Sequence, residues 1–411
     1  MKVVVIGAGI VGLATAYELA MAGHSVTVVE VNKNVGQGAS GGNGAQLSYS
    51  YVQPLADPAI WAQLPKLLLQ KDSPLAFSPS FSANQWQWLF EFMKACTKTQ
   101  SRKGTQTLLR MGALSRQRFE VMMAHLKILP GDCDYQENGK LVLYRNHRSF
   151  SGALKQMEFQ KSLCLGGEQF AVTGQQVFDL EPTLGGTEKS IFGAIHTPSE
   201  CVVNTQKICD LLADRLPTLG VSFKMEHTLG ELAQKAASDL NIFWVVCAGA
   251  QSYDILKTFG LRVPVYPIKG YSITLPCKQQ QLPKLSITDS AIKTVFAPLS
   301  CQENPAIRVA GFAEIAGMNR DVEQRKIQVL LAATCKTFPK LEIDPQTYLL
   351  GISPWAGLRP ATPTSVPMVG NLRGLPKNVL VNIGHGALGL TLAFGTAYEL
   401  CQTIRKSAGP I

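Results

Sequence analysis

The first thirty residues follow a hydrophobic pattern that predicts a strand, a turn, a helix and a second strand. Residues 3–6 form a short β-branched run, which is typical of a buried parallel strand. Apolar residues then recur with a period of about 3.6 residues up to Met21, and Gly23 ends the helix that this period predicts. The next apolar run, VTVVE, ends at Glu30. The pattern therefore predicts a β-α-β unit at the N-terminus.

Two later apolar runs have the same form. Residues 242–247 lead into Ala248, Gly249 and Ala250, after which Ser252 can begin a helix. Residues 379–383 lead into a glycine-rich turn, and a helix follows it to about residue 405. Small residues at the carboxyl end of a buried strand are typical of the sheet edge where α/β proteins bind ligands. We expect both segments to join the N-terminal unit in one domain.

The intervening segments have a different pattern. In YSITLP the apolar side chains of Tyr271, Ile273 and Leu275 alternate with hydroxyls, which predicts a half-buried strand, and AIRVAGFAEI continues in the same manner. Because 411 residues exceed the usual size of one hydrophobic core, we expect two domains. The predicted fold class is α/β, with a discontinuous Rossmann-like domain of residues 1–53, 196–255 and 346–411, and an α+β domain with a mostly antiparallel sheet, of residues 54–195 and 256–345.

Charge and cysteine content narrow the classes of partner. The formal net charge of +10 is spread over scattered lysines and arginines, so it fits diffuse surface charge or a basic patch facing a membrane, but not nucleic-acid binding. Ten cysteines without a CxxC pair indicate reduced thiols in the cytoplasm, and six histidines without ligand spacing predict no metal site. The apolar N-terminus contains Tyr17 and Glu18, so we interpret it as part of the fold rather than as a signal peptide or membrane span.

The turn after the first strand has the spacing GxGxxG. Gly7 permits a tight turn, Gly9 lets the backbone approach a pyrophosphate, and Gly12 lets the helix pack closely on the strand. Glu30 would accept hydrogen bonds from a ribose and would repel a ribose phosphate, which argues against NADP. A glycine-rich turn without a ligand is the alternative. The dinucleotide contacts predicted here are Gly7, Gly9, Ile10, Val11, Gly12 and Glu30.

A long loop of small residues, from Gly36 to Tyr51 and called the small-residue loop below, follows the second strand. Its backbone N–H groups can lie against an extended cofactor, although a flexible linker is the alternative. The glycine-rich turn before the last helix would aim N–H groups and the positive helix end at the same crevice, where they would stabilise negative charge on a reduced flavin. The further cofactor contacts that we predict are Ser40, Asn43, Gly44, Ala45, Gln46, Leu229, Ala248, Gly249, Gly384, Gly386, Ala387, Leu388, Gly389 and Thr391.

Six stretches carry a family resemblance: the fingerprint at 7–30, SGGNGAQLS at 40–48, VYPIKGYSITLP at 265–276, RVAGFAEIAGMN at 308–319, WAGLRPATP at 355–363 and GHGALGLT at 384–391. Together they resemble the D-amino-acid oxidase superfamily of FAD enzymes, and most of all its D-amino-acid dehydrogenase branch, over nearly the whole chain. The resemblance implies non-covalent FAD bound by a domain split into three segments, with a substrate domain between them. Residues 43–46 read Asn-Gly-Ala-Gln instead of the expected Asn-Ala-Gly-Gln, and Ala310 replaces a usual glycine. Related sarcosine oxidases attach flavin to a cysteine that residues 361–366 lack, so we expect releasable FAD.

The resemblance places Arg359 over the flavin, where its guanidinium fork would hold the carboxylate of an amino-acid substrate. An arginine paired with a structural acid or a carbonyl is the alternative. The phenols of Tyr51 and Tyr271 would complete the grip unless they only pack, and Lys269 either lies near the flavin or is solvated. The expected reaction is hydride transfer from the α-carbon to flavin N5, giving an imino acid that water converts to a 2-oxo acid and ammonia.

The stretch FSANQWQWLFEFMKAC, residues 81–96, predicts an aromatic helix. Its apolar side chains fall on one side at Trp86, Leu89, Phe90 and Met93, and on another at Trp88 and Phe92. Core packing is one interpretation, and a helix resting on a bilayer is the other. The resemblance implies a peripheral enzyme on the inner face of the cytoplasmic membrane that passes electrons to quinone or another acceptor, with oxygen left open.

Three other functions fit parts of the same pattern. The first is an oxidase or dehydrogenase of glycine, sarcosine or a cyclic imino acid such as D-proline or hydroxyproline. The GxGxxG turn alone also permits a nicotinamide-linked dehydrogenase, or a nucleotide-binding module without turnover. The C-terminal glycine turn and Arg359 favour flavin chemistry over the last two.

Overall fold

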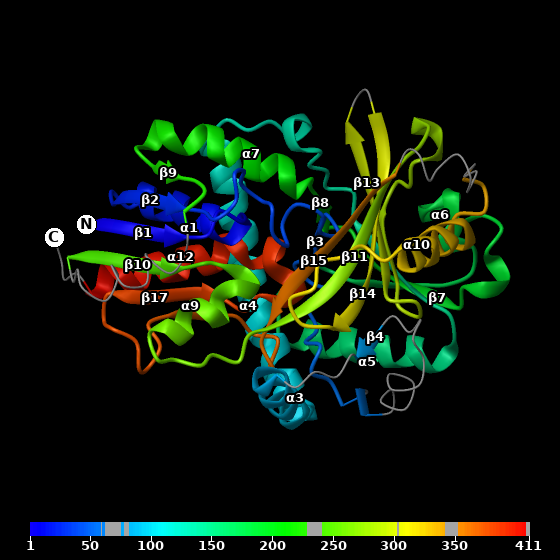
Figure 1. Ribbon diagram of the computed structural model, residues 1–411. Coiled ribbons are helices and arrows are strands. Elements are labelled where there is room, and N and C mark those ends of the chain that lie inside the picture. The colour runs from blue at the N-terminus through cyan, green and yellow to red at the C-terminus, as the bar shows by residue number, and fades with distance from the viewer. Residues whose placement is uncertain are drawn as a thin grey trace.

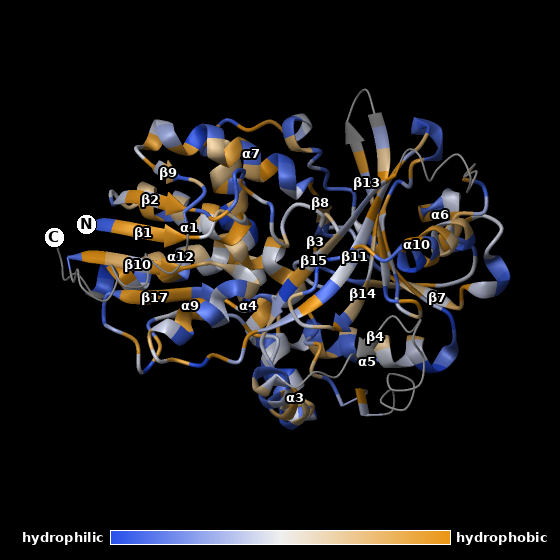
Figure 2. Ribbon diagram, viewed as in Figure 1, coloured by the Kyte–Doolittle hydropathy of each residue, from blue (hydrophilic) through white to orange (hydrophobic). Residues whose placement is uncertain are grey.

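The computed structural model describes residues 1–58, 60–61, 75–77, 82–227, 241–301, 304–341 and 352–407. Two sheets organise the chain (Figure 1), and the N-terminus lies beside the first of them. The first sheet is orange along most of its length in the hydropathy view of Figure 2, as expected for strands covered on both faces. The α/β fold class with a parallel cofactor-type sheet is confirmed.

The first sheet has the strand order β16-β17-β10-β1-β2-β9 and is parallel except at β16. Its strands are β1 (Lys2–Ile6), β2 (Ser25–Val29), β9 (Ser222–Lys224), β10 (Ile242–Val246), β16 (Met368–Gly370) and β17 (Val379–Ile383). The strands β2 and β9 lie on one side of β1 in the sheet. The strands β10 and β17, which come later in the sequence, lie on its other side. The order reverses between β1 and β10, which is where doubly wound sheets bind ligands.

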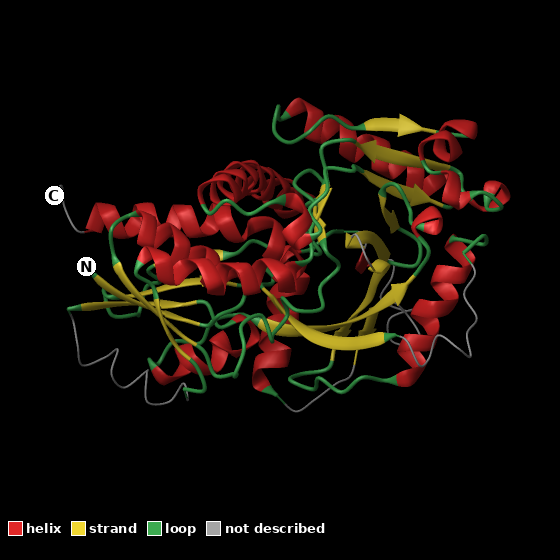
Figure 3. Cartoon of the chain, turned by 90° about the horizontal axis from the view of Figure 1, so that it is seen from above, coloured by secondary structure: helices red, strands yellow, loops and turns green. Residues whose placement is uncertain are grey.

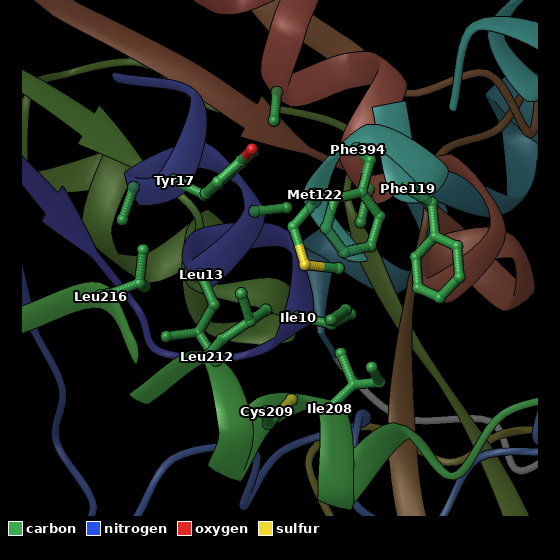
Figure 4. Close-up of a cluster of buried hydrophobic side chains, with 14 of the residues drawn as sticks. Ile10, Leu13, Tyr17, Phe119, Met122, Ile208, Cys209, Leu212, Leu216 and Phe394 are labelled. Atoms are coloured by element: carbon green, nitrogen blue, oxygen red, sulfur yellow. The ribbon is translucent and has the colours of Figure 1, made fainter. Parts of the chain in front are cut away.

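Helices cover the first sheet, and those on one face form its main core. These are α1 (Ile10–Met21), α4 (Lys98–His125), α7 (Thr205–Arg215) and α12 (Gly389–Ser407), while α9 (Ser252–Thr258) follows β10. In Figure 4, Leu13 of α1 lies among apolar side chains from the other three helices, and the rings of Phe119 and Phe394 are 5.2 Å apart. The helix α4 therefore packs with the cofactor half, although the predicted boundaries assigned residues 98–125 to the other domain.

The second sheet is long, curved and mostly antiparallel, as predicted (Figure 3). Its order is β15-β11-β14-β13-β12-β5-β7-β6, with β4 beside β14. The strands are β4 (Leu75–Phe77), β5 (Lys140–Tyr144), β6 (Phe170–Val172), β7 (Gly193–Thr197), β11 (Tyr266–Pro276), β12 (Ser286–Asp289), β13 (Thr294–Cys301), β14 (Asn304–Ile315) and β15 (Ser353–Ala361). β15 pairs with β11 although the predicted boundaries placed it in the first domain. The helices α5 (His147–Ser162), α6 (Gln175–Leu180) and α10 (Gln324–Thr337) belong to this half.

The predicted aromatic helix is α3 (Ala83–Ala95), and the face that it buries is the smaller of its two apolar sides. Trp88 and Phe92 are buried and stacked with ring centres 5.0 Å apart, and the Trp88 indole N–H donates to Ala361 O at 2.8 Å. Trp86 and Phe90 are 50% and 62% exposed. A partner for the indole N–H decides the orientation, because a buried indole needs one. The described part of α3 thus packs on the second sheet and also presents aromatic rings to solvent.

Candidate active site

A cavity of about 1440 Å³ extends from the first sheet to the second. Nearly every predicted cofactor contact lines it: Gly7, Gly9, Ile10, Val11, Glu30, Ser40, Asn43, Gly44, Ala45, Gln46, Ala248, Gly249, Gly384, Gly386, Ala387, Leu388, Gly389 and Thr391. Gly12 lies behind the lining, and Leu229 lies outside the described residues. The three predicted substrate contacts, Tyr51, Tyr271 and Arg359, line the same cavity.

The GxGxxG turn has the close contacts that its glycines were expected to permit. Gly7 has φ +108°, and a Cβ there would lie 2.7 Å from Cys247 O on the neighbouring strand end. A Cβ on Gly12 would lie 1.8 Å from Gly7 O, so the start of α1 touches the turn itself. Glu30 is fixed at the end of β2, because its carboxylate accepts the Ala8 N–H at 2.7 Å. Backbone and carboxylate are thus held where a dinucleotide would lie.

The Ser40 side chain is hydrogen-bonded to the first residue of α1. Its hydroxyl oxygen accepts the Ile10 N–H at 3.0 Å, which ties the small-residue loop to the amide groups of the turn. The same loop is bound to α12, because the Ser48 N–H donates to Thr391 Oγ1 at 3.2 Å. Part of the loop forms β3 (Gln46–Leu47), which pairs with β8 (Cys201–Val202). The loop is therefore a built wall of the cavity and not a free linker.

The unusual order of residues 43–46 has a steric explanation. Ala45 adopts φ +56°, a left-handed conformation that favours glycine. The Asn43 side chain offsets part of this cost, because Oδ1 accepts the Ala45 N–H at 2.9 Å. Gly44 cannot exchange places with Ala45 freely, since a Cβ on Gly44 would lie 2.8 Å from the Val295 side chain. Ala310, which replaces another usual glycine, also faces Gly44, at 3.7 Å from that Cβ.

Ala45→Gly is expected to stabilise the protein. Removing the Cβ relieves the strain of the left-handed conformation, about 1–2 kcal/mol. Glycine also has a larger conformational entropy in the unfolded state, which offsets part of this gain in stability. The net gain in the free energy of unfolding should be about 0.5–1 kcal/mol, measured by denaturant unfolding of the apoprotein. Gly38→Ala, at a position where a Cβ meets nothing within 4 Å, is the control for glycine's entropy alone and should raise the free energy of unfolding by about 0.4–1 kcal/mol. A destabilised Ala45→Gly protein would contradict the strain assignment.

The middle of the small-residue loop is bonded to the second sheet. The Ser272 hydroxyl donates to Gly42 O at 2.6 Å, and Arg308 donates to Asn43 O at 3.0 Å. Gln46 Nε2 donates to Ser286 Oγ at 2.6 Å. The loop that was predicted to hold the cofactor is thus positioned by strands of the second half of the chain.

The C-terminal turn lies beside the strand that carries Arg359. Gly384 has φ +82°, and Ala361 and His385 form an antiparallel bridge. The His385 ring is buried, which lowers its pKa to about 3 and keeps it neutral, and its Nε2 lies 3.0 Å from Thr396 Oγ1. His385 therefore supports the turn, while the backbone that follows it opens α12 towards the cavity.

Arg359 reaches the cavity from β15, between buried neighbours. One guanidinium N–H donates to Phe312 O at 2.6 Å, and burial lowers the pKa of Arg359 to about 10. Within the described residues Arg359 forms no ion pair with a carboxylate. The Phe312 carbonyl points to Arg359 because the backbone at Phe312 is left-handed, with φ +64°. This residue lies where the pairing of β11 with β14 is irregular. A half-buried cation with one neutral partner and unused N–H groups facing a cavity is suited to bind an anion.

Gly270 makes the space that the guanidinium occupies. A Cβ on Gly270 would lie 2.3 Å from Arg359 Nη2. Gly270→Ala should therefore displace the guanidinium and raise KM for a carboxylate substrate at least roughly tenfold, while FAD content stays unchanged. Steady-state kinetics with flavin absorbance measured on the same samples would check this. Wild-type KM in Gly270→Ala would show that the guanidinium position does not matter.

The two tyrosines differ in what their hydroxyls can do. The Tyr271 hydroxyl donates in a shared arrangement to Glu314 at 3.0 Å and Glu323 at 2.9 Å, so only its ring is left to the cavity. Burial raises the pKa of Tyr51, and its hydroxyl has no hydrogen-bond partner in the described part of the chain. Lys269 donates to Asn319 at 2.9 Å and is not among the described residues that line the cavity.

Sequence reasoning missed several lining cations. Among the described residues, seven cationic side chains and two carboxylates line the cavity: Lys98, Arg102, Lys140, Lys155, Lys293, Arg320 and Arg359, with Glu30 and Asp57. Lys140 precedes a fully apolar run, LVL, and a lysine at a strand end is usually solvated. Only the hydrogen bonds of Lys140 to the small-residue loop show that this lysine is buried beside the cavity. The excess of positive charge suits a pyrophosphate and a carboxylate in one cavity.

The lining fits FAD. The GxGxxG turn and Glu30 lie at one end of the cavity. The small-residue loop lines the cavity with glycines, which leave room for a cofactor, and the start of α12 lies near Arg359. Cys247 is the one cysteine among the described lining residues, and burial raises the pKa of its thiol to about 12, so it stays protonated. An unreactive thiol is consistent with the releasable, non-covalently bound FAD that the sequence predicts.

Known proteins share this architecture. The chain matches the family model of FAD dependent oxidoreductases, DAO, over residues 2–403. It is 37% identical to D-amino acid dehydrogenase 2 of Ralstonia nicotianae, covering 100% of this chain and 98% of that one, and 36% identical to D-amino acid dehydrogenase 2 of Pseudomonas aeruginosa, covering 98% and 95%. Two solved structures share the fold: L-proline dehydrogenase from P. horikoshii (TM-score 0.72, 14% identity, covering 99% and 93%) and glycine oxidase from Bacillus cereus (TM-score 0.69, 20% identity, covering 99% and 95%). The chain therefore belongs to the DAO family of FAD-dependent oxidoreductases.

Proposed function

We propose that this protein is a D-amino-acid dehydrogenase, which oxidises D-amino acids to 2-oxo acids and ammonia. The observation that carries the proposal is the half-buried Arg359 guanidinium, which lines the cofactor cavity without a carboxylate partner among the described residues. A free carboxylate is the anion that fits a planar two-donor fork. The names of the two curated relatives support the D configuration of the substrate.

The chain's own residues bind and orient the substrate. Phe312 O holds one N–H of Arg359 and leaves the rest of the fork for the substrate carboxylate. Tyr51 and Tyr271 line the same cavity, and we expect the Tyr51 hydroxyl to bond the carboxylate or the amine and the Tyr271 ring to form a wall. Bound FAD would supply the two-electron acceptor for the hydride that leaves the α-carbon. Holding one end of a small substrate fixes the direction of that C–H bond, so orientation rather than a strong base accounts for the rate.

The proposal is tested by mixing the FAD-loaded protein anaerobically with single amino acids and following the visible absorbance of the flavin. D-amino acids should bleach the flavin, and their L-enantiomers should not. The panel includes glycine, sarcosine, D-proline and hydroxyproline, because bleaching by these alone would assign the protein to the alternative class of amine oxidation. A flavin that no member of the panel bleaches would remove the proposed activity.

We also infer that electrons pass to quinone at a membrane surface on which α3 rests. No helix within the described residues is long and apolar enough to span a bilayer. The exposed rings of Trp86 and Phe90 instead suit an interfacial contact, and Lys94 Nζ lies 4.1 Å from the Phe90 ring, where it can face anionic lipid. The buried side of the same helix bonds to the strand of Arg359 through Trp88.

Co-sedimentation with anionic liposomes at low salt checks the membrane contact. The wild-type protein should bind, and Trp86→Ser with Phe90→Ser should weaken binding at least roughly tenfold, since both changes remove inserted aromatic surface. Leu129→Ser, at a 65% exposed residue outside α3, is the matched control and should bind like the wild type. If the wild-type protein stays in solution at low salt, the membrane contact is wrong.

A further inference from the structure

Lys140 is a buried lysine that the proposed reaction does not use. It begins β5, its side chain is 2% exposed, and it lines the cavity. Its ammonium donates to Ser48 Oγ at 2.7 Å and to Gln46 Oε1 at 3.0 Å, and it lies 4.4 Å from the centre of the Tyr51 ring. All three neighbours belong to the small-residue loop, so a cation from the second sheet is fixed against the segment that lies along the cofactor.

The loop joins this cation to the start of α12. Ser48 accepts from Lys140 through its side chain and donates through its backbone N–H to Thr391 Oγ1, at 3.2 Å. Thr391 is the third residue of α12, and the turn before that helix bridges to the strand of Arg359. In the placement proposed above, the flavin ring lies between this helix start and the guanidinium. One loop residue therefore separates the Lys140 ammonium from the ring end of the cavity.

A buried carboxylate, Glu200, interacts electrostatically with Lys140 and is bonded to the same loop. Glu200 is 1% exposed, and its carboxylate accepts the Ser50 N–H at 2.6 Å. Burial lowers the pKa of Lys140 to about 8, and Glu200 acts against that shift. Lys140 lines the cavity, whereas Glu200 is not among the described lining residues. Lys140 is thus the member of this pair that faces the cavity, and a protein interior screens the field of its charge weakly.

We propose that Lys140 is a positioning residue for the flavin's electrostatics: its ammonium, held by Ser48 and Gln46, raises the reduction potential of the bound FAD. The flavin ring gains negative charge on reduction, so a fixed cation one residue away stabilises the reduced form more than the oxidised form. A higher potential favours the transfer of a hydride from an amino acid to the flavin. The inference rests on the placement of the flavin under the proposed function, but it does not depend on which amino acid is oxidised.

The test measures FAD itself. Lys140→Met and Lys140→Gln both remove the charge, and the glutamine keeps a hydrogen-bond donor for the loop. At pH 7 both variants should bind one FAD per chain, with a midpoint potential below that of the wild type in dye-equilibration titrations. Their affinity for sulfite, which adds to flavin and leaves it negatively charged, should fall roughly tenfold. Lys140→Arg, which keeps the charge, should have nearly the wild-type potential and sulfite affinity.

Lys155→Met is the matched control, because it removes an exposed cation from the rim of the same cavity and should leave both values unchanged. The proposal is overturned if the neutral Lys140 variants hold FAD at the wild-type potential. It is also overturned if neither neutral variant retains FAD, since the charge would then serve folding. Failure of the proposed amino-acid oxidation would leave the potential measurable, so the two ideas fail separately.

Discussion

Arg359→Ala is expected to lower kcat/KM for D-amino acids by roughly 10²–10⁴-fold while the protein keeps its flavin. The substitution removes two charge-assisted hydrogen bonds to the substrate carboxylate, each of about 1.5–3 kcal/mol, and the orientation that they impose. Phe312 O also loses its donor, but that carbonyl can be reached by water once the side chain is gone. Steady-state kinetics on samples of known FAD content measure the effect.

Arg359→Lys separates charge from geometry. Lysine keeps the positive charge but offers no planar fork, so activity should be intermediate between the alanine variant and the wild type. Primary amines without a carboxylate serve as control substrates, because Arg359→Ala should change their slow oxidation little. Equal kcat/KM for wild type and Arg359→Ala would show that Arg359 does not bind the substrate carboxylate. The proposed function would then lose its main support.

Gly12→Ala is expected to yield a protein almost free of FAD. The new methyl group would lie 1.8 Å from Gly7 O, and that atom belongs to the turn that carries the pyrophosphate-binding backbone. The backbone cannot move aside as a flexible side chain can, so α1 must shift away from β1 and the turn must change shape. The ratio of flavin to protein absorbance after purification should fall more than roughly tenfold, and thermal unfolding should begin at a lower temperature.

Gly131→Ala is the control for this change, because a Cβ at Gly131 meets no atom within 4 Å and the residue lies outside the cavity lining of the described chain. It should keep full FAD content. If Gly12→Ala also retained a full complement of FAD, the close packing of helix on turn would not be needed for cofactor binding, and the role assigned to this glycine would be lost.

The sequence alone predicted the cofactor half well, because its signals are local. The strand and helix bounds near Gly7 follow from an apolar run, a glycine turn and a regular period, which are set by neighbours in the chain. The same holds for β10 and β17, whose predicted ranges differ from the observed ones by at most a residue. Arg359 was found through a motif, and its isolation from carboxylates in the described structure is what makes the motif chemically meaningful.

Contacts between distant segments could not be predicted in this way. The phenol of Tyr271 meets two carboxylates from β14 and the start of α10, and nothing in the sequence near β11 indicates them. The buried side of α3 is the one with the smaller apolar stripe, and its hydrogen bonds join Trp88 to Ala361 and Gln85 to Tyr266, 273 and 181 residues away. Lys140 shows the same limit, since its partners lie 92 and 94 residues from it.

The small-residue loop follows a strand of the first sheet, yet Ser272, Ser286 and Arg308 of the second half fix its middle. The molecule consequently cannot be divided into a cofactor module and a substrate module that work apart. A fragment holding only the parallel sheet would keep the groove for the adenosine but lose the shape of the wall beside the ring. Recognition of FAD is therefore a property of the assembled whole, and the halves must come together before the cofactor can be gripped along its full length.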